Sequence, residues 1–193
     1  MSVVIINYNA GNVQSVTYAL QRLGVEPVLS EDPEVIQSAD RVIFPGVGEA
    51  STAMGFLKAR KLDEVIKGLK QPVFGVCLGL QLMCRHSEEN DTQCLGIFDQ
   101  EVKKFEPKLK VPQMGWNTLT SMQSPLFEGI GPESYVYFVH SYYAELSDDT
   151  IAVTDYVNPF SAALNKDNFY ALQAHPEKSG KVGAKILENF LKL

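Results

Sequence analysis

An α/β fold, with an open mixed, mainly parallel sheet flanked by helices, is predicted by two features of the sequence. Short apolar runs alternate with segments of helical periodicity in the first half of the chain, as in successive βαβ units. The first run, Val3–Ile6, is apolar throughout, which is typical of a strand buried on both faces of a parallel sheet. The chain has 193 residues, enough for one domain with a sizeable core, and we expect residues 1–193 to form a single domain.

The other elements of the first half follow in order. Apolar residues at positions 13, 16, 20 and 23 predict a helix with Asn12 as its N-cap and Gly24 just past its end. Strands are expected at residues 26–29, Arg41–Phe44 and residues 72–76, and helices at residues 51–60 and 80–84. Because ligands bind at the carboxyl ends of parallel strands, we expect Asn7, residues 45–48 and Cys77 to share one edge of the sheet.

From about residue 100 the pattern changes to short strands separated by Pro, Gly and Asp turns. We expect strands at residues 102–105, 117–121, 135–139 and 151–156 and at Phe169–Leu172, and interpret residues 102–156 as an antiparallel or mixed extension of the sheet. Residues 86–91 are expected to be a solvated loop. The spacing of apolar residues from 182 to 191 predicts a closing amphipathic helix.

Composition excludes several classes of protein. A formal charge of −6 argues against a nucleic-acid partner. No run of 18 apolar residues predicts a membrane span, and the first residues lack the basic region of a signal peptide. The cysteines, Cys77, Cys84 and Cys94, are odd in number and not at metal-binding spacing, so we expect free thiols in the cytoplasm and no metal or organic cofactor.

The run Gly75-Val76-Cys77-Leu78-Gly79 has the pattern of a nucleophile elbow, with cysteine in place of serine. An apolar run precedes it and a helix-like segment follows, so the order is strand, tight turn, helix. Glycine on both sides allows a sharp turn and close approach of the backbone. Cys77 is therefore a candidate nucleophile. The alternative is a buried cysteine in an ordinary βα unit, because free cysteine is often a core residue.

Two further motifs supply the groups that a cysteine nucleophile requires. His175 and Glu177, separated by Pro176, have the types of a general base and of the group that orients it. The run Pro45-Gly46-Val47-Gly48 follows a strand and can present backbone N–H groups to an oxyanion, with the N–H of Leu78 as a second donor. Taken alone, the first motif is also compatible with a polar turn, and the second with a plain turn.

Together, these three motifs resemble those of class I, triad-type glutamine amidotransferases, and the resemblance spans the whole chain. Within that class, four further segments are similar to the glutaminase subunits of imidazole glycerol phosphate synthases. These segments are residues 8–16, 49–54, 111–117 and 137–142. The resemblance implies a flavodoxin-like fold, glutamine hydrolysis for histidine biosynthesis, and transfer of ammonia to a (β/α)8-barrel cyclase subunit in a 1:1 heterodimer.

The resemblance also implies roles for individual residues. Cys77, His175 and Glu177 correspond to the catalytic triad, and Gly46, Val47 and Leu78 to the oxyanion site. In this family the Pro-Gly-Val-Gly strand can be misaligned in the resting enzyme. The glutamine pocket is expected to include Gly48, Gln81, Ser141 and Tyr142. Residues facing the partner are expected to be Met114, Trp116 and Tyr137, although Trp116 also fits an ordinary core or rim aromatic, and Tyr137 a strand residue packed inward.

The chain departs from the family pattern at Asn7 and Asn9, where Asp and Gly are usual, and at Ala174, where Phe is usual. None of these changes touches the triad. Other functions remain open at this point: a triad glutaminase of another pathway, a peptidase-like cysteine hydrolase, or a binding module with an inactive site. The Met114-Gly115-Trp116-Asn117 segment argues against the first, and the complete set of triad residues against the last.

Overall fold

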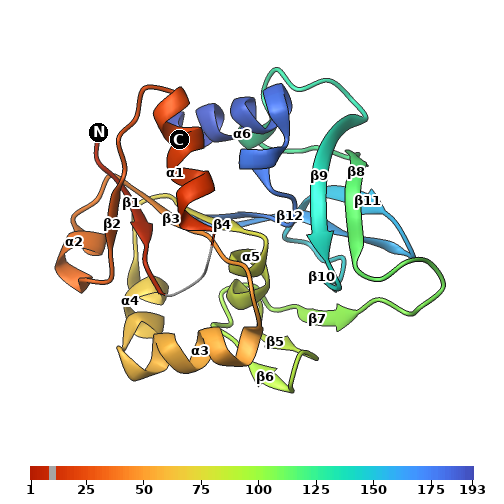
Figure 1. The fold of residues 1–193 in the computed structure, drawn as a ribbon, viewed down its shortest axis with the longest axis horizontal. Helices are drawn as coiled ribbons and strands as arrows, with labels where there is room; N and C mark the ends of the chain where they lie inside the picture. Colours follow the sequence, from red (N-terminus) through yellow and green to blue (C-terminus); the bar gives the residue numbers. More distant parts are fainter. Residues whose placement is uncertain (9–11) are drawn as a thin grey trace.

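The computed structural model describes residues 1–8 and 12–193, and its center is a seven-stranded sheet with the order β11-β12-β13-β4-β3-β1-β2 (Figure 1). Five neighbouring strands run parallel. These are β1 (Val3–Ile6), β2 (Val28–Ser30), β3 (Arg41–Phe44), β4 (Val73–Val76) and β13 (Phe169–Leu172). The antiparallel strands β12 (Pro159–Lys166) and β11 (Thr150–Asp155) complete the sheet at one edge. The predicted mixed, mainly parallel sheet is confirmed.

Helices cover both faces of this sheet (Figure 1). One core lies between the sheet and helices α1 (Val13–Arg22) and α6 (Gly180–Lys192). The other core includes residues of α2 (Pro33–Gln37), α3 (Ala50–Ala59), α4 (Leu62–Gly68) and α5 (Leu78–Met83). Alternate residues of β1 enter the two cores: Val3 and Ile5 the first, Val4 and Ile6 the second. This explains why the strand is apolar at every position.

The second half of the chain differs from the predicted extension of the main sheet. Strand β7 (Glu101–Lys104) lies in a separate four-stranded sheet with β10 (Tyr142–Ala144), β5 (His86–Ser87) and β6 (Thr92–Gln93). Strands β8 (Gln113–Leu119) and β9 (Ser134–His140) form their own antiparallel pair. Of the strands predicted between residues 102 and 156, only β11 joins the main sheet.

The prediction of a solvated loop at residues 86–91 is wrong. This segment begins with β5 and leads into the β5–β6 pair, and Ser87 is fully buried. Its polar residues are satisfied within the structure: the ring nitrogens of His86 lie 2.9 Å from Glu101 and 2.8 Å from Asp91. A polar sequence therefore forms an ordered hairpin here because its charged groups pair with one another.

Several element boundaries also differ. Strand β2 starts at Val28 instead of residue 26, and α3 starts one residue earlier than predicted because the Glu49 carboxylate accepts the N–H groups of Ser51 and Thr52. Within residues 1–8 and 12–193, no helix combines the length and apolar character needed to cross a membrane. Of the family departures, Asn9 lies outside the described residues, and Ala174 is fully buried in the core beneath α6.

Candidate active site

The three sequence motifs follow the carboxyl ends of three adjacent parallel strands. Residues 45–48 follow β3, Cys77 follows β4, and residues 173–177 follow β13, and these strands are neighbours in the order β13-β4-β3. The parallel register aligns their ends, pairing Phe44 with Gly75 and Leu172 with Val76. The topology of the sheet therefore brings segments that are far apart in sequence to one edge, as the sequence predicted.

Cys77 occupies a strained turn between β4 and α5. Its φ of 53° and ψ of −106° lie outside the regions that L-residues ordinarily adopt. The flanking glycines have no room for a side chain. A Cβ atom on Gly79 would lie 1.9 Å from the backbone oxygen of Phe44, and one on Gly75 would lie 2.8 Å from Met83 Sδ. The elbow predicted from the glycines is thus present, and the close packing around it holds the cysteine in place.

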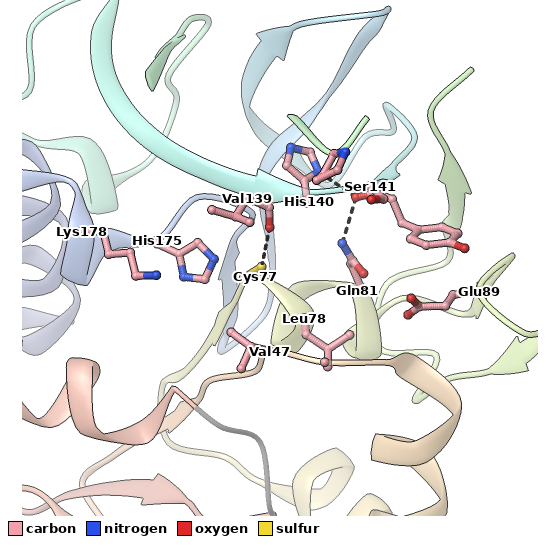
Figure 2. A pocket seen from close by; sticks show the side chains of 13 residues that line it. Val47, Cys77, Leu78, Gln81, Glu89, Val139, His140, Ser141, His175 and Lys178 are labelled. Atoms are coloured by element: carbon pink, nitrogen blue, oxygen red, sulfur yellow. Dashed lines mark hydrogen bonds between the residues drawn. The ribbon is translucent and has the colours of Figure 1, made fainter. Parts of the chain in front are cut away.

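The sulfur of Cys77 has three polar neighbours. The ring of His175 is turned toward it (Figure 2), the Val139 carbonyl oxygen lies 3.7 Å away, and Nε2 of Gln173 lies 3.6 Å away. Cys77 is 6% exposed, so the sulfur is reached only through the pocket that it lines.

His175 and Glu177 form a buried pair. Nδ1 of His175 lies 2.8 Å from Oε1 of Glu177, and both side chains are almost entirely excluded from solvent. Burial alone would lower the pKa of His175, but hydrogen bonds to Cys77 and Glu177 and their negative charges raise it above its ordinary value. Burial acts to raise the pKa of Glu177, and the hydrogen bond and charge of His175 outweigh it, so that this pKa is lowered.

Asn12 joins this pair, although the sequence predicted only a helix cap at this position. It does occupy the N-cap position of α1, but its side chain makes no capping hydrogen bond. Instead, Nδ2 of Asn12 donates to Oε1 of Glu177 and lies 3.5 Å from Nδ1 of His175. No local sequence signal pointed to this contact, because the partners are 165 residues apart.

The oxyanion donors expected at residues 46–47 and 78 are not free to act together in this conformation. The N–H of Leu78 donates to the carbonyl oxygen of Gly46 at 3.3 Å. In a trans peptide the carbonyl and N–H groups point in opposite directions. The Gly46–Val47 peptide therefore aims its oxygen at Leu78, and its own N–H, that of Val47, points away from it.

A pocket of about 320 Å³ opens beside Cys77 (Figure 2). The residues predicted for a glutamine pocket all line it: Gly48, Gln81, Ser141 and Tyr142. Sequence reasoning missed Glu89 and Lys178, which also line the pocket and carry opposite charges. Glu89 follows the β5 strand, in the segment for which the sequence predicted a loop. One of its oxygens accepts the N–H of Ala50 at 2.8 Å, which fixes the carboxylate.

The β8–β9 pair covers the site on one side and exposes an apolar surface. Met114, Trp116 and Tyr135 are 58%, 56% and 59% exposed. Trp116 lies opposite Tyr137 in the register, and their rings meet edge to face with centroids 5.8 Å apart. Tyr137 is partly buried, so it is neither fully outward nor packed into the core. Because Met114 lies opposite Val139, which lines the pocket, this apolar surface adjoins the site.

His140 holds this pair of strands against the pocket. It is buried, with Nδ1 2.7 Å from the Tyr142 carbonyl oxygen and Nε2 2.8 Å from Oε1 of Gln113. Burial lowers its pKa to about 4, which keeps the ring neutral at neutral pH. Among the described residues, no group of three or more His, Cys, Asp or Glu side chains is arranged to hold a metal ion.

A strained cysteine elbow, a buried His–Glu pair and an open pocket at the end of a mainly parallel sheet are the features of a cysteine-dependent hydrolase. The family model for "Glutamine amidotransferase class-I" matches residues 4–193. The chain belongs to this family. Two solved structures share its fold. A glutamine amidotransferase has a TM-score of 0.77 at 20% identity, covering 99% of this chain and 98% of that one, and a putative GMP synthase protein from Thermoplasma acidophilum has a TM-score of 0.75 at 21% identity, covering 100% and 93%.

More similar relatives are named imidazole glycerol phosphate synthase subunit HisH. The protein of that name from Bacteroides thetaiotaomicron is 63% identical, and that from Bacteroides fragilis is 60% identical, each over 196 aligned positions that cover 100% of both chains. The protein from Yersinia pseudotuberculosis is 48% identical with the same coverage. The similarity therefore extends over the full length of both partners in each comparison.

Proposed function

We propose that this chain is the glutaminase subunit of an imidazole glycerol phosphate synthase, hydrolysing glutamine to glutamate and ammonia for a cyclase subunit in histidine biosynthesis. The observation that carries this proposal is the placement of Cys77, His175 and Glu177 together at the mouth of a pocket of amino-acid size. The full-length similarity to subunits of that synthase supports the choice among glutaminases.

In the proposed reaction, the thiolate of Cys77 attacks the side-chain amide carbon of glutamine. His175 donates a proton to the leaving nitrogen, which departs as ammonia and leaves a glutamyl thioester on Cys77. His175 then takes a proton from water, and the hydroxide formed cleaves the thioester to glutamate and the free cysteine. Glu177 holds the imidazole ring in the required orientation and stabilises its charged form, as its contact with Nδ1 allows.

The pocket has the groups that an amino-acid substrate requires. Glu89 presents a fixed carboxylate to the same space (Figure 2), and this suits the α-ammonium group of glutamine. Gln81, Ser141, Tyr142 and Gly48 surround the remainder of the substrate. The oxyanion of the tetrahedral intermediate is stabilised by the N–H groups of Leu78 and Val47 once the Gly46–Val47 peptide has turned over.

The exposed apolar surface of β8–β9 supports a docking role for Met114 and Trp116, with Tyr137 supporting Trp116 from the facing strand. A partner seated there lies next to the pocket and can receive ammonia without its release into solvent. We assign this place to a (β/α)8-barrel cyclase in a 1:1 heterodimer in the cytoplasm. The word "subunit" in the relatives' names is consistent with a larger assembly.

The test is reconstitution with purified components. The chain is mixed with the cyclase subunit encoded by the same genome, and glutamate formation is measured with glutamine and the nucleotide substrate of the cyclase. Co-elution at 1:1 stoichiometry and glutamine-dependent product formation are expected. A chain that forms no complex and hydrolyses no glutamine under these conditions would overturn the proposal.

A further inference from the structure

Gln173 is a fully buried amide at the end of β13 that has no part in the mechanism described so far. Its backbone N–H donates to the Ala162 oxygen at 2.8 Å, which fixes the start of its side chain. Its Nε2 lies 3.6 Å from the Cys77 sulfur, and its Oε1 accepts a hydrogen bond from Nε2 of Gln81 at 3.1 Å. A polar side chain with no access to water is thus bonded at both ends.

The orientation of this amide is set by a backbone carbonyl two steps away. The oxygen of Tyr142 can only accept a hydrogen bond, so Gln81 must turn its NH₂ group toward it, at 2.9 Å. The same NH₂ group then requires an acceptor on Gln173, which must present Oε1. If the Gln173 amide were reversed, two NH₂ groups would face each other; if both amides were reversed, two oxygens would meet at Tyr142. Only one arrangement satisfies all the contacts, and it places an N–H donor at the sulfur of Cys77.

A donor at this place acts differently on the two forms of the sulfur. A thiolate accepts the N–H bond more strongly than a neutral thiol does, because hydrogen bonds to charged acceptors are stronger. The Val139 carbonyl acts in the opposite direction, since it can accept a hydrogen bond only from the protonated thiol. We propose that Gln173 is a positioning residue that stabilises the thiolate of Cys77 through its buried N–H donor. This inference rests on the proposed role of Cys77 as nucleophile.

The same chain of contacts joins the nucleophile to the substrate pocket. Gln81 and Tyr142 line the pocket, and the contacts run from the Tyr142 carbonyl through Gln81 and Gln173 to the sulfur. Substrate that fixes Gln81 and Tyr142 therefore also fixes the donor at Cys77. This arrangement links the binding of glutamine to the readiness of the nucleophile.

The test follows the reactivity of Cys77 with iodoacetamide across pH in the full chain, with the site of alkylation identified by mass spectrometry. This readout requires neither a partner nor glutamine turnover. The titratable groups around the sulfur are common to all the proteins compared. They are Tyr8, Glu89, His140, Tyr142, His175 and Lys178.

Gln173→Met keeps the approximate shape of the side chain and removes the donor. The pH midpoint of alkylation should rise by about one pH unit, the size expected for the loss of one hydrogen bond to a charged acceptor. Gln173→Glu should raise it further, because it replaces the donor with an acceptor that becomes negatively charged. The matched control is Gln100→Met, a buried glutamine whose amide donates to the Glu145 oxygen away from the pocket, and its midpoint should equal that of the wild type.

A second measurement needs no variant at Gln173. In the wild-type chain, the side-chain amide resonances of Gln173 should titrate with the same midpoint as the alkylation of Cys77, whereas those of Gln100 should not. Folded Gln173 variants with an unchanged midpoint, or Gln173 resonances that do not follow the titration, would overturn the inference. If the midpoint shifts but the wild-type complex hydrolyses no glutamine, the proposed function fails while the role of Gln173 at the sulfur stands.

Discussion

The carbonyl oxygen of Gly46 accepts a hydrogen bond from the N–H of Leu78, the group expected to bind the oxyanion. An acceptor therefore occupies the place at which a donor is required. Side-chain space around Gly46 is also closed, since a Cβ atom would lie 2.3 Å from Tyr8 Oη and 2.8 Å from Leu78 Cβ. The peptide after Gly46 can turn over without moving a side chain of its own at that position, which favours a switch built on the backbone alone.

The first prediction is that the isolated chain is almost inactive as a glutaminase although its triad is assembled. The loss of one oxyanion donor costs on the order of 10²–10³ in rate, and an opposing carbonyl adds to this. A partner and its ligand need to favour the turned-over peptide by only about 1–3 kcal/mol to matter, which is an ordinary allosteric coupling. Glutamate release is measured for the chain alone, with the cyclase, and with the cyclase and its nucleotide ligand. Equal rates in all three samples would contradict the prediction.

The second prediction separates the members of the triad. Cys77→Ala should abolish glutamine-dependent turnover, but added ammonium salt should restore cyclase product. His175→Ala should lower kcat on the order of 10⁶-fold, as loss of the base does in comparable triads, and Glu177→Gln on the order of 10²–10⁴-fold, because an amide still holds the ring. Steady-state glutaminase assays of the complexes give the comparison. An equal loss for Glu177→Gln and His175→Ala would argue against an orienting role.

The third prediction concerns the elbow. Gly79→Ala places a Cβ atom 1.9 Å from the Phe44 backbone oxygen, which must move, so the variant should lose about 1–3 kcal/mol in free energy of unfolding. Gly55→Ala is the matched control, since Gly55 lies inside α3 with open space around it. Alanine there should stabilise the protein by about 0.5–1 kcal/mol. Urea unfolding measures both changes, and a Gly79→Ala variant as stable as Gly55→Ala would show that the elbow has room to spare.

The fourth prediction is a pH dependence of stability. The pKa of His140 is lowered to about 4 by burial, with an unfavourable charge on His175 adding to the effect. Between about pH 6.5 and pH 4 the unfolded chain binds a proton that the folded chain excludes, so the free energy of unfolding falls as pH decreases through this window. The loss is up to about 3 kcal/mol for this residue. His140→Gln should be less stable at pH 7 and show a flatter pH dependence in urea unfolding.

His86 provides the control with the opposite sign. Hydrogen bonds to Asp91 and Glu101 raise the pKa of this largely accessible histidine, so its contribution to stability is present at low pH and is lost as pH rises. His86→Gln should therefore make stability fall more steeply toward low pH. A flattening of equal size in both variants would mean that burial of His140 is not the cause.

The sequence predicted the strands β1, β3 and β13 with their observed limits, because each is a short apolar run between clear breaks. It also predicted the three motifs that meet at the pocket, since glycine spacing and residue type report local turn geometry directly. It did not reveal that β7 and β8–β9 leave the main sheet, because period-two patterns do not name a pairing partner. Asn12, Glu89 and Gln173 went unassigned for the same reason: their roles arise from contacts across the fold.

The last prediction tests Asn12 as a positioning residue of the His175–Glu177 pair. Its Nδ2 donates to the same Glu177 oxygen that contacts His175, and it lies 3.5 Å from Nδ1 of that histidine. Removing this donor in Asn12→Ala should leave the carboxylate freer to rotate and lower kcat of the complex about 10-fold to 100-fold, the size of one hydrogen bond to a charged group. KM for glutamine should change little, because Asn12 does not line the pocket.

Asn12→Asp distinguishes positioning from packing. This substitution keeps the shape of the side chain but sets a second carboxylate against Glu177, which has to take up a proton or turn away from His175. Its kcat should therefore fall further than that of Asn12→Ala, and the acid limb of the pH–rate profile should move. Asn158, whose side-chain amide bonds only to the oxygen of the next residue among the contacts described, serves as the control for an Asn→Asp change on the surface. If Asn12→Asp retains more activity than Asn12→Ala, the contact with Glu177 serves packing alone.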